Sequence, residues 1–303
     1  MPKRASPKQP SFVTDALLLD TYSVVFRAFH ALPRLSTSTG MPSSALYGFS
    51  SLVLKLLREY RPRALSFAVD APVRTFRAER YAEYKAGRAR TPPELAQELE
   101  RLPRLLEAFG VPVFCVPGFE ADDVLATLAR RLGLAGKNVL IASGDRDLLQ
   151  TADERTRVLF LGRRGQDALL YDAPGVEQRF GVPPAKLPSL MALVGDTSDN
   201  LEGVAGVGPR TAAALVAEFG SMSELVRHLE RVPAKLRDSL RDASERLLLN
   251  EELARLREDV PLGTDELAAP LTDPARIRLR ALFEQLEYKS LVERLERLEL
   301  APA

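Results

Sequence analysis

The sequence predicts an α/β fold with a mostly parallel central sheet flanked by helices, followed by a second domain made of helices. Up to residue 173, short apolar runs alternate with segments whose apolar residues recur at helical spacing. From residue 174 onward the strand-like runs stop, and one helical pattern follows another. Aspartate also ends or follows three of the apolar runs, which places carboxylates at one edge of the sheet.

The expected strands are short apolar runs between turn signals. They cover residues 16–20, 65–69, 111–116, 138–142 and 158–161. The only cysteine, Cys115, falls in the third run, so we expect its side chain to be buried in a strand. A single cysteine excludes an internal disulfide and fits a reducing compartment such as the cytoplasm.

The expected helices follow from apolar spacing and from proline. Residues 43–60 form one amphipathic pattern, and a second helix runs from Pro93 to Phe109, because proline is favoured in a first turn. Pro103 is expected to bend this second helix. The helices of the second domain are expected at residues 176–180, 184–194, 210–219, 223–229 and 234–257.

The composition is that of an ordinary globular protein, with 46% hydrophobic and 27% charged residues. Residues 1–13 contain three basic residues, three prolines and no acid, which predicts a disordered basic tail. No apolar run approaches the roughly 20 residues that span a bilayer, and no signal-peptide core is present. We therefore expect no membrane partner, an α/β domain over residues 14–173 and a helical domain over residues 174–303.

Acidic residues gather at the expected edge of the sheet. Residues 117–123, PGFEADD, place three acids at a helix start, with no basic residue between Arg104 and Arg130. Acids in a first turn also complement the helix dipole, which is the simpler interpretation of this run alone. The other acids favour a shared site. The full set is Asp20, Asp70, Glu120, Asp122, Asp123, Asp145, Asp147, Asp196 and Asp199.

So many carboxylates in a small volume would raise each other's pKa and bind protons unless cations lay among them. Oxygen ligands of this kind suit Mg²⁺ or Mn²⁺, whereas Zn²⁺ prefers nitrogen and sulfur. The chain offers Zn²⁺ only His30, His228 and Cys115. The acidic set therefore predicts a site for hard divalent cations.

A basic segment precedes the acidic run. Residues 71–91 alternate basic and aromatic side chains, which suits single-stranded nucleic acid, because the basic side chains meet phosphates and the rings offer stacking faces. A solvent-exposed helical connection is the alternative. The side chains concerned are Arg74, Arg77, Arg80, Lys85, Arg88 and Arg90, with Phe76, Tyr81 and Tyr84.

The glycine-rich run GVAGVGPRTAAAL, residues 203–215, lies between two expected helices. Gly206 and Gly208 leave backbone N–H groups free at a helix start, an arrangement that binds phosphate. A generic glycine turn is the alternative. Together with Arg210 and Thr211, however, the run has the pattern of a helix–hairpin–helix, which we place at about residues 188–230.

The order of these motifs resembles the 5′-nuclease or flap endonuclease family, including the 5′→3′ exonuclease domain of bacterial DNA polymerase I. The resemblance extends from about Ala16 to about Leu295, and because few residues follow, it implies a free-standing nuclease or an isolated domain. The runs that carry it are LLLD, RAFHA, YGF, YKAGR, GFEADDVLA, SGDRDLLQ, VGDTSDN and GVAGVG. The departures keep every carboxylate; they are Thr21, Arg146, Glu202, Ala205 and Arg210.

The resemblance implies a PIN-like nuclease fold and roles for the matching residues. The nine carboxylates look like ligands of two or more Mg²⁺ or Mn²⁺ ions. Lys85 and Arg88 match catalytic basic residues in a helical arch, about residues 74–104, that embraces the 5′ strand. The helix–hairpin–helix would grip duplex DNA and bind K⁺. The implied DNA contacts are Arg27, Arg77, Tyr84, Gly203, Gly206, Gly208, Arg210 and Thr211.

The implied activity is two-metal hydrolysis of DNA phosphodiesters at 5′ flaps, nicks or 5′ ends, in replication and repair beside a DNA polymerase and a ligase. Action on RNA–DNA hybrids is left open. Two other interpretations are a junction- or flap-binding protein that does not cut DNA, and a PIN-type ribonuclease. Nine anions facing phosphate argue against the first, and the helix–hairpin–helix with YKAGR favours DNA over the second.

Overall fold

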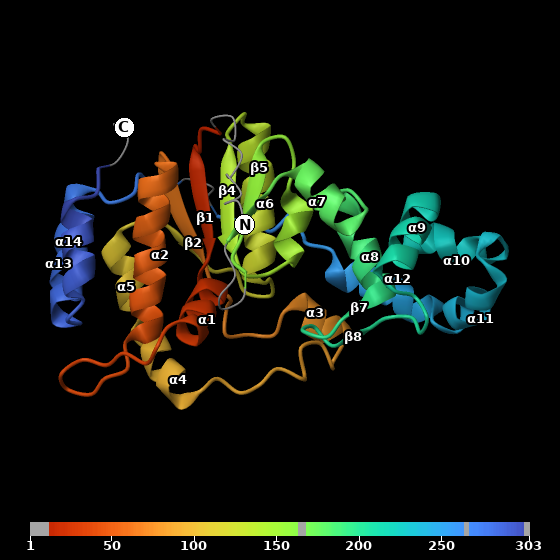
Figure 1. Cartoon of the computed structure of the whole chain (residues 1–303), viewed down its shortest axis with the longest axis horizontal. Coiled ribbons are helices and arrows are strands. Elements are labelled where there is room, and N and C mark those ends of the chain that lie inside the picture. Colours follow the sequence, from red (N-terminus) through yellow and green to blue (C-terminus); the bar gives the residue numbers. More distant parts are fainter. Residues whose placement is uncertain (1–11, 163–167, 264–266, 300–303) are drawn as a thin grey trace, which may run out of the picture.

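The computed structural model describes residues 12–162, 168–263 and 267–299 (Figure 1). The expected basic tail falls almost entirely on residues 1–11, outside the described residues. Across the described part of the chain, no helix combines the length and the hydropathy needed to cross a bilayer.

A six-stranded sheet with the order β3-β2-β1-β4-β5-β6 forms the centre of the molecule. All neighbouring strands are parallel except β5 and β6, so the predicted mostly parallel sheet is confirmed. Every residue of β1 is buried, as expected for a parallel strand covered on both faces. The strands are β1 Ala16–Asp20, β2 Ala64–Ala68, β3 Val113–Phe114, β4 Val139–Ser143, β5 Thr156–Phe160 and β6 Leu169–Tyr171.

Two details of the strand prediction are wrong. The third strand, β3, is only two residues long, and Cys115 lies just beyond it with an exposed side chain. The short antiparallel strand β6 was not anticipated, because three residues carry too little periodicity to be recognised.

Helices cover both faces of the sheet. Leu17 and Leu19 of β1 point into one core, and Leu18 points into the other, so the strand's alternation divides the two layers. The first core is closed by α1 Thr21–Ala31, α2 Ser44–Tyr60, α4 Pro93–Leu99, α5 Leu102–Phe109, α13 Asp273–Gln285 and α14 Lys289–Glu296. On the other face lies α6 Ala121–Leu134, whose core continues into the helical domain.

The helical domain extends away from α6 in Figure 1. The expected single helix over residues 234–257 is two helices that meet at Ala243. A two-stranded hairpin, β7 Gly195–Asp196 and β8 Leu201–Glu202, contradicts the expectation that strands stop at residue 174. The helices are α7 Ala173–Phe180, α8 Leu187–Val194, α9 Pro209–Phe219, α10 Met222–Arg227, α11 Ala234–Asp242 and α12 Ser244–Ala254.

The last two helices do not pack in the helical domain. The expected helical domain of residues 174–303 therefore includes helices that the structure places elsewhere. Helix α13 packs against α5, and α14 packs against α2. Phe283 and Leu291 are fully buried in the same core as Phe49. The chain therefore leaves the α/β domain for the helical domain and then returns to it.

The segment expected to be a helical arch is mostly turn and irregular chain. Helix α3 covers only Phe76–Arg80, turns follow to Gly87, and the chain then runs without regular structure to α4 (Figure 1). Lys85 has a left-handed backbone with φ 58°, which an α-helix cannot contain. Pro92 and Pro93 then start α4 rather than continuing an earlier helix.

Candidate nuclease site

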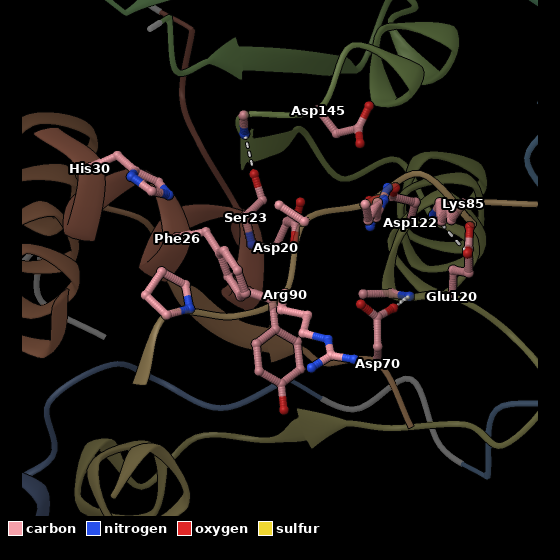
Figure 2. A pocket seen from close by; sticks show the side chains of 16 residues that line it. Asp20, Ser23, Phe26, His30, Asp70, Lys85, Arg90, Glu120, Asp122 and Asp145 are labelled. Carbon is pink, nitrogen blue, oxygen red and sulfur yellow. Dashed lines mark hydrogen bonds and ion pairs between the residues drawn. The ribbon is translucent and has the colours of Figure 1, made fainter. Parts of the chain in front are cut away.

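Carboxylates from separate strands meet at the carboxyl edge of the sheet, where the strand order reverses between β1 and β4. Asp20 ends β1, Asp70 follows β2 and Asp145 follows β4, so the fold brings them to one place. They line a cavity of about 590 Å³ together with Glu120 and Asp122 (Figure 2). The cations that line it are Lys85, Arg88 and Arg90.

Short hydrogen bonds hold these carboxylates in place. Asp20 caps α1 by accepting from the Ser23 amide at 3.2 Å, and it accepts from the Ser143 hydroxyl at 2.6 Å. Asp70 accepts from the Ala121 amide at 2.7 Å and so fixes the start of α6. Sequence reasoning missed Ser23, whose hydroxyl also accepts from the Gly144 amide at 2.7 Å; a side chain that supports a ligand has no signature of its own in one sequence.

The remaining acids, Asp147, Asp196 and Asp199, are not among the residues that line this cavity. Asp147 begins a 3₁₀ turn, Asp147–Thr151, and the β7–β8 hairpin carries Asp196 and Asp199. Burial, followed by the charges of Asp145, Asp199 and Asp196, raises the pKa of Asp147 well above its usual value. Asp196 forms an ion pair with Arg146 at 3.3 Å. The hairpin that sequence reasoning missed therefore presents two of the predicted ligands.

The electrostatics of the cavity fit a cation site. Burial raises the pKa of Asp20 to about 7, opposed by the Ser143 hydrogen bond and reinforced by Asp145. The pKa values of Asp122 and Asp145 are also raised, chiefly by burial. Because the atoms that would bind the metal are all carboxylate oxygens, these residues suit Mg²⁺ or Mn²⁺. Within the described ranges no three His, Cys, Asp or Glu side chains are already grouped closely enough to hold a metal ion.

Basic side chains from the arch segment occupy the carboxylates instead. The ammonium of Lys85 lies 2.7 Å from Glu120 and 3.9 Å from Asp199, and Arg88 lies 3.2 Å from Asp199. Burial lowers the pKa of Lys85, but the charges of Glu120 and Asp199 outweigh this and raise it. Both predicted catalytic cations therefore lie at the acidic cavity and remain charged.

Tyr84 differs from the expected stacking residue. Its ring is 7% exposed and packs in a small cluster with Leu201, Leu253 and Ala254 of the helical domain. Its hydroxyl donates to Asp199 at 2.7 Å. Burial and the charges of Glu120 and Asp199 raise the pKa of Tyr84, so it stays a donor. In this arrangement the ring is not available to a nucleotide base.

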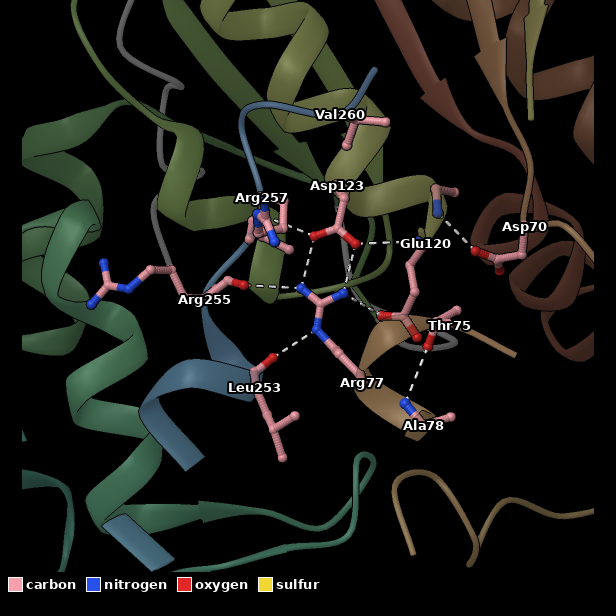
Figure 3. Close-up of polar contacts among 12 residues, drawn as sticks. Asp70, Thr75, Arg77, Ala78, Glu120, Asp123, Leu253, Arg255, Arg257 and Val260 are labelled. Atoms are coloured by element: carbon pink, nitrogen blue, oxygen red, sulfur yellow. Dashed lines mark hydrogen bonds and ion pairs between the residues drawn. The ribbon is translucent and has the colours of Figure 1, made fainter. Parts of the chain in front are cut away.

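Arg77 and Asp123 do not fit their expected roles (Figure 3). Asp123 is fully buried, and its two oxygens accept from the guanidinium of Arg77 at 2.6 and 2.7 Å. Arg77 is itself only 1% exposed. A phosphate contact needs an accessible guanidinium, and a metal ligand must face the cavity, whereas these side chains satisfy each other inside the protein. Residue type and spacing in the sequence did not indicate that these two side chains point into the protein interior.

A second cavity, of about 810 Å³, adjoins the first across Ser23, Gly144 and Asp145. The charged side chains on its wall are mainly basic, in contrast to the acidic first cavity: Arg27, Arg146 and Arg179 lie there with Asp145 and Asp196. The Arg27 side chain donates to the Leu161 carbonyl at 3.0 Å, so the expected phosphate contact lies beside the site. Arg179, which sequence reasoning did not single out, is exposed near the end of α7.

The glycine run forms the expected connection between α8 and α9. Gly203 approaches the backbone so closely that a Cβ there would lie 2.3 Å from the Val194 carbonyl oxygen. Gly206 has φ +81°, and Gly208 caps α9 with a backbone conformation open to any residue. Gly208 and Arg210 are exposed and Thr211 is half-buried at the start of α9, so this helix start is open to a ligand.

Comparisons with known proteins identify the family and the fold. The family model described as 5′-3′ exonuclease, N-terminal resolvase-like domain, matches residues 15–181, and that of the 5′-3′ exonuclease C-terminal SAM fold matches residues 182–276. DNA polymerase I of Mycobacterium bovis is 38% identical over 293 residues, covering 96% of this chain and 32% of the relative. The thermostable DNA polymerase I of Thermus thermophilus is 41% identical over 288 residues, covering 95% and 34%. The chain thus spans about a third of the length of these relatives.

Solved structures share the fold at lower identity. A structure of T5 D15 protein co-crystallised with metal ions has a TM-score of 0.63 and 22% identity, covering 94% of this chain and 99% of the other. The catalytic core of Rad2 in complex with DNA substrate has a TM-score of 0.61 and 19% identity, covering 95% and 94%. The matches of the two family models, which together span residues 15–276, show that the chain belongs to the 5′-3′ exonuclease family.

Proposed function

We propose that this chain is a structure-specific 5′→3′ exonuclease and flap endonuclease that hydrolyses DNA phosphodiesters with the help of Mg²⁺ or Mn²⁺. The observation that carries the proposal is the acidic cavity, where carboxylates from several elements gather and where Lys85 and Arg88 form ion pairs with Glu120 and Asp199. A binding protein without chemistry has no need of anions facing a phosphate backbone. A hydrolase that uses metal ions needs these anions to hold the ions beside the phosphate.

The carboxylates would hold the divalent cations. Two ions bound together would lower the pKa of the attacking water and stabilise the leaving oxygen. Asp145 lines both cavities, so it lies where two ions could share a ligand. The residues proposed to hold the ions, directly or through water, are Asp20, Asp70, Glu120, Asp122, Asp145, Asp147, Asp196 and Asp199.

Lys85 and Arg88 would meet the oxygens of the reacting phosphodiester. Both cations now pair with carboxylates that would bind the metal ions, so metal binding would release them toward substrate. Fixed positive charge beside a phosphate stabilises the charge that develops during hydrolysis. The neighbouring basic cavity, with Arg27 and Arg179, would hold phosphates adjacent to the one that is cut.

The helical domain would hold the duplex. The exposed start of α9, with Gly208, Arg210 and Thr211, offers backbone N–H groups to a phosphate, and the helix–hairpin–helix would also hold K⁺. Relatives support a nucleic-acid substrate: one structure is a T5 D15 flap endonuclease complex with DNA and metal ions, and another is human GEN1 with Holliday junction DNA. We extend this to 5′-flap, nicked or 5′-ended duplexes here, with RNA–DNA hybrids as a further substrate class.

The two relatives compared above are DNA polymerases. We therefore place the activity in DNA replication and repair in the cytoplasm, beside a polymerase and a ligase.

The test of the proposed function is cleavage of a labelled 5′-flap duplex in Mg²⁺, in Mn²⁺ and in EDTA, with an all-RNA control. Metal-dependent cuts near the flap junction, with the RNA intact, support the proposal. Tight flap binding without cleavage in either metal would contradict it and favour a binding protein.

A further inference from the structure

The Arg77–Asp123 pair joins three parts of the chain that are far apart in sequence (Figure 3). Arg77 lies on α3, and Asp123 lies in the first turn of α6. The third part is residues 253–260, here named the return segment, which leads from α12 back to the α/β domain. The Arg77 guanidinium donates to the Leu253 carbonyl at 2.7 Å and to the Arg255 carbonyl at 2.9 Å.

Asp123 completes the connection from the other side. Its Oδ1 atom accepts from the Arg257 amide at 2.9 Å, besides the two hydrogen bonds from Arg77. Both side chains are almost fully buried, and their polar atoms are paired. Replacing a buried ion pair of this kind with apolar groups is often neutral for stability. We therefore ask which parts of the structure the pair holds in position.

The Arg77–Asp123 pair also holds residues of the acidic cavity. The Oδ2 atom of Asp123 accepts from the Glu120 amide at 3.1 Å, and Arg77 donates to Oε2 of Glu120 at 3.3 Å. The other carboxylate oxygen of Glu120 faces Lys85 in the cavity. Asp122 lies between these two anchored residues in the chain, so its position on the first turn of α6 follows from theirs.

The return segment is also fastened to the turn that carries Asp147. The Gln150 side chain donates to the Ala254 carbonyl at 2.7 Å and accepts from the Leu256 amide at 3.2 Å. Gln150 belongs to the 3₁₀ turn Asp147–Thr151. One short stretch of main chain therefore holds the start of α6 and the turn that carries Asp147 at a fixed separation.

We propose that Arg77 is a positioning residue which, through Asp123 and the return segment, holds Glu120 and Asp122 at the separation that divalent cations require. The inference rests on the proposed function, because it concerns the same cavity. It assigns Asp123 to the support of the metal site rather than to the ligand set. It also makes the return segment part of that support, so the two domains are joined beside the metal site.

The test measures Mn²⁺ binding to the full chain without DNA, by calorimetry. Two variants keep the wild-type net charge: Arg77→Lys, which loses the two-pronged contact, and the double variant Arg77→Met with Asp123→Asn. Loss of a group that orients a metal ligand weakens metal binding by roughly 10- to 100-fold, so we expect a change of this size in both. The matched control is Arg130→Lys, because Arg130 pairs at the surface with Glu258 of the return segment at 3.0 Å; it should bind Mn²⁺ as wild type does.

Two results would overturn the inference. One is Mn²⁺ affinity within twofold of wild type in Arg77→Lys and in the double variant. The other is a double variant whose salt dependence of flap-duplex binding falls by about one phosphate contact, because that would make Arg77 a DNA contact. Circular dichroism checks folding, and Arg77→Lys, which keeps a charge against Asp123, decides the matter if the double variant does not fold. Wild-type protein that binds no Mn²⁺ would contradict the proposed function itself.

Discussion

The ammonium of Lys85 lies 2.7 Å from the Glu120 carboxylate, and both side chains line the acidic cavity. The Lys85 amide also donates to the Asp199 carbonyl at 3.2 Å, which helps to hold the residue in its left-handed backbone conformation. A cation of the protein itself therefore neutralises part of the cavity's negative charge. The arrangement makes Lys85 and divalent cations competitors for the same carboxylate, with consequences for binding and for catalysis.

Replacing Lys85 with alanine should separate these two roles. We expect tighter Mn²⁺ binding by the DNA-free protein, because a competing cation is removed, and single-turnover flap cleavage slower by roughly 10²- to 10³-fold. Affinity for the flap duplex should change much less. Arg280→Ala, which removes exposed pairs with Glu284 and Glu296, is the control and should cleave normally. If affinity fell while the cleavage rate held, Lys85 would be a binding contact only.

Asp145→Asn should abolish cleavage and retain flap binding. The carboxylate lines both cavities, and burial among like charges raises its pKa, so its negative charge is useful only to a bound cation. The neutral amide removes the ligand without adding bulk. Gel-shift and cleavage assays on one flap substrate compare it with Asp238→Asn, whose side chain is 88% exposed on α11. Unreduced cleavage by Asp145→Asn would remove Asp145 from the metal site.

The stability of the metal-free protein should fall as the pH rises. The folded-state pKa of Asp20 is about 7 and its ordinary value is 3.8, so between these pH values the folded protein holds a proton that the unfolded chain has released. Asp20→Asn should therefore stabilise the protein in EDTA at pH 8, by on the order of 4 kcal/mol, and make little difference at pH 4. Urea unfolding at both pH values measures this. A stabilisation that is equal at pH 4 and pH 8 would show that ionisation of Asp20 is not the cause.

Arg179→Ala should weaken DNA binding without slowing the chemistry. Arg179 is exposed on the wall of the basic cavity, and removing a phosphate-binding cation from this wall should reduce the salt dependence of binding by about one phosphate. The cleavage rate at saturating DNA should match wild type. Arg297→Ala, at an 81% exposed side chain beyond α14, should leave affinity unchanged. An equal decrease of affinity in both variants would point to general charge rather than to this cavity.

The parts of the fold that sequence reasoning recovered are those whose signal is local. Leu17 to Leu19 form a continuous buried run, and Pro93 starts a helix, because each pattern depends on neighbours in the chain. The direction of a charged side chain is not local. Arg77 carries the same signal as Arg88 in the sequence, yet one is buried against Asp123 and the other lies at the cavity.

Long-range choices were missed for the same reason. The apolar spacing of α13 predicts a buried face but does not say which core it enters, and Phe283 joins Phe49 rather than the helical domain. The two-residue strands of the β7–β8 hairpin are too short to show a period, although they position Asp196. Ser23 and Ser143 hold Asp20 through contacts that only the folded chain brings together.

Gly203→Ala should damage the glycine run between α8 and α9, which we propose holds duplex DNA, whereas Gly208→Ala should not change its fold. A Cβ at Gly203 would lie 2.3 Å from the Val194 carbonyl oxygen. The backbone fixes the position of the Cβ, and the oxygen belongs to the backbone, so the main chain of this segment must shift. Overpacking of this kind costs about 1–3 kcal/mol.

Gly208 is the matched control. A Cβ there meets nothing within 4 Å, and the φ of −85° suits alanine. We expect Gly203→Ala to lower the free energy of unfolding by that amount and to weaken duplex binding. Gly208→Ala should keep wild-type stability, and equal stability of the two variants would show that the close approach at Gly203 is relieved without cost.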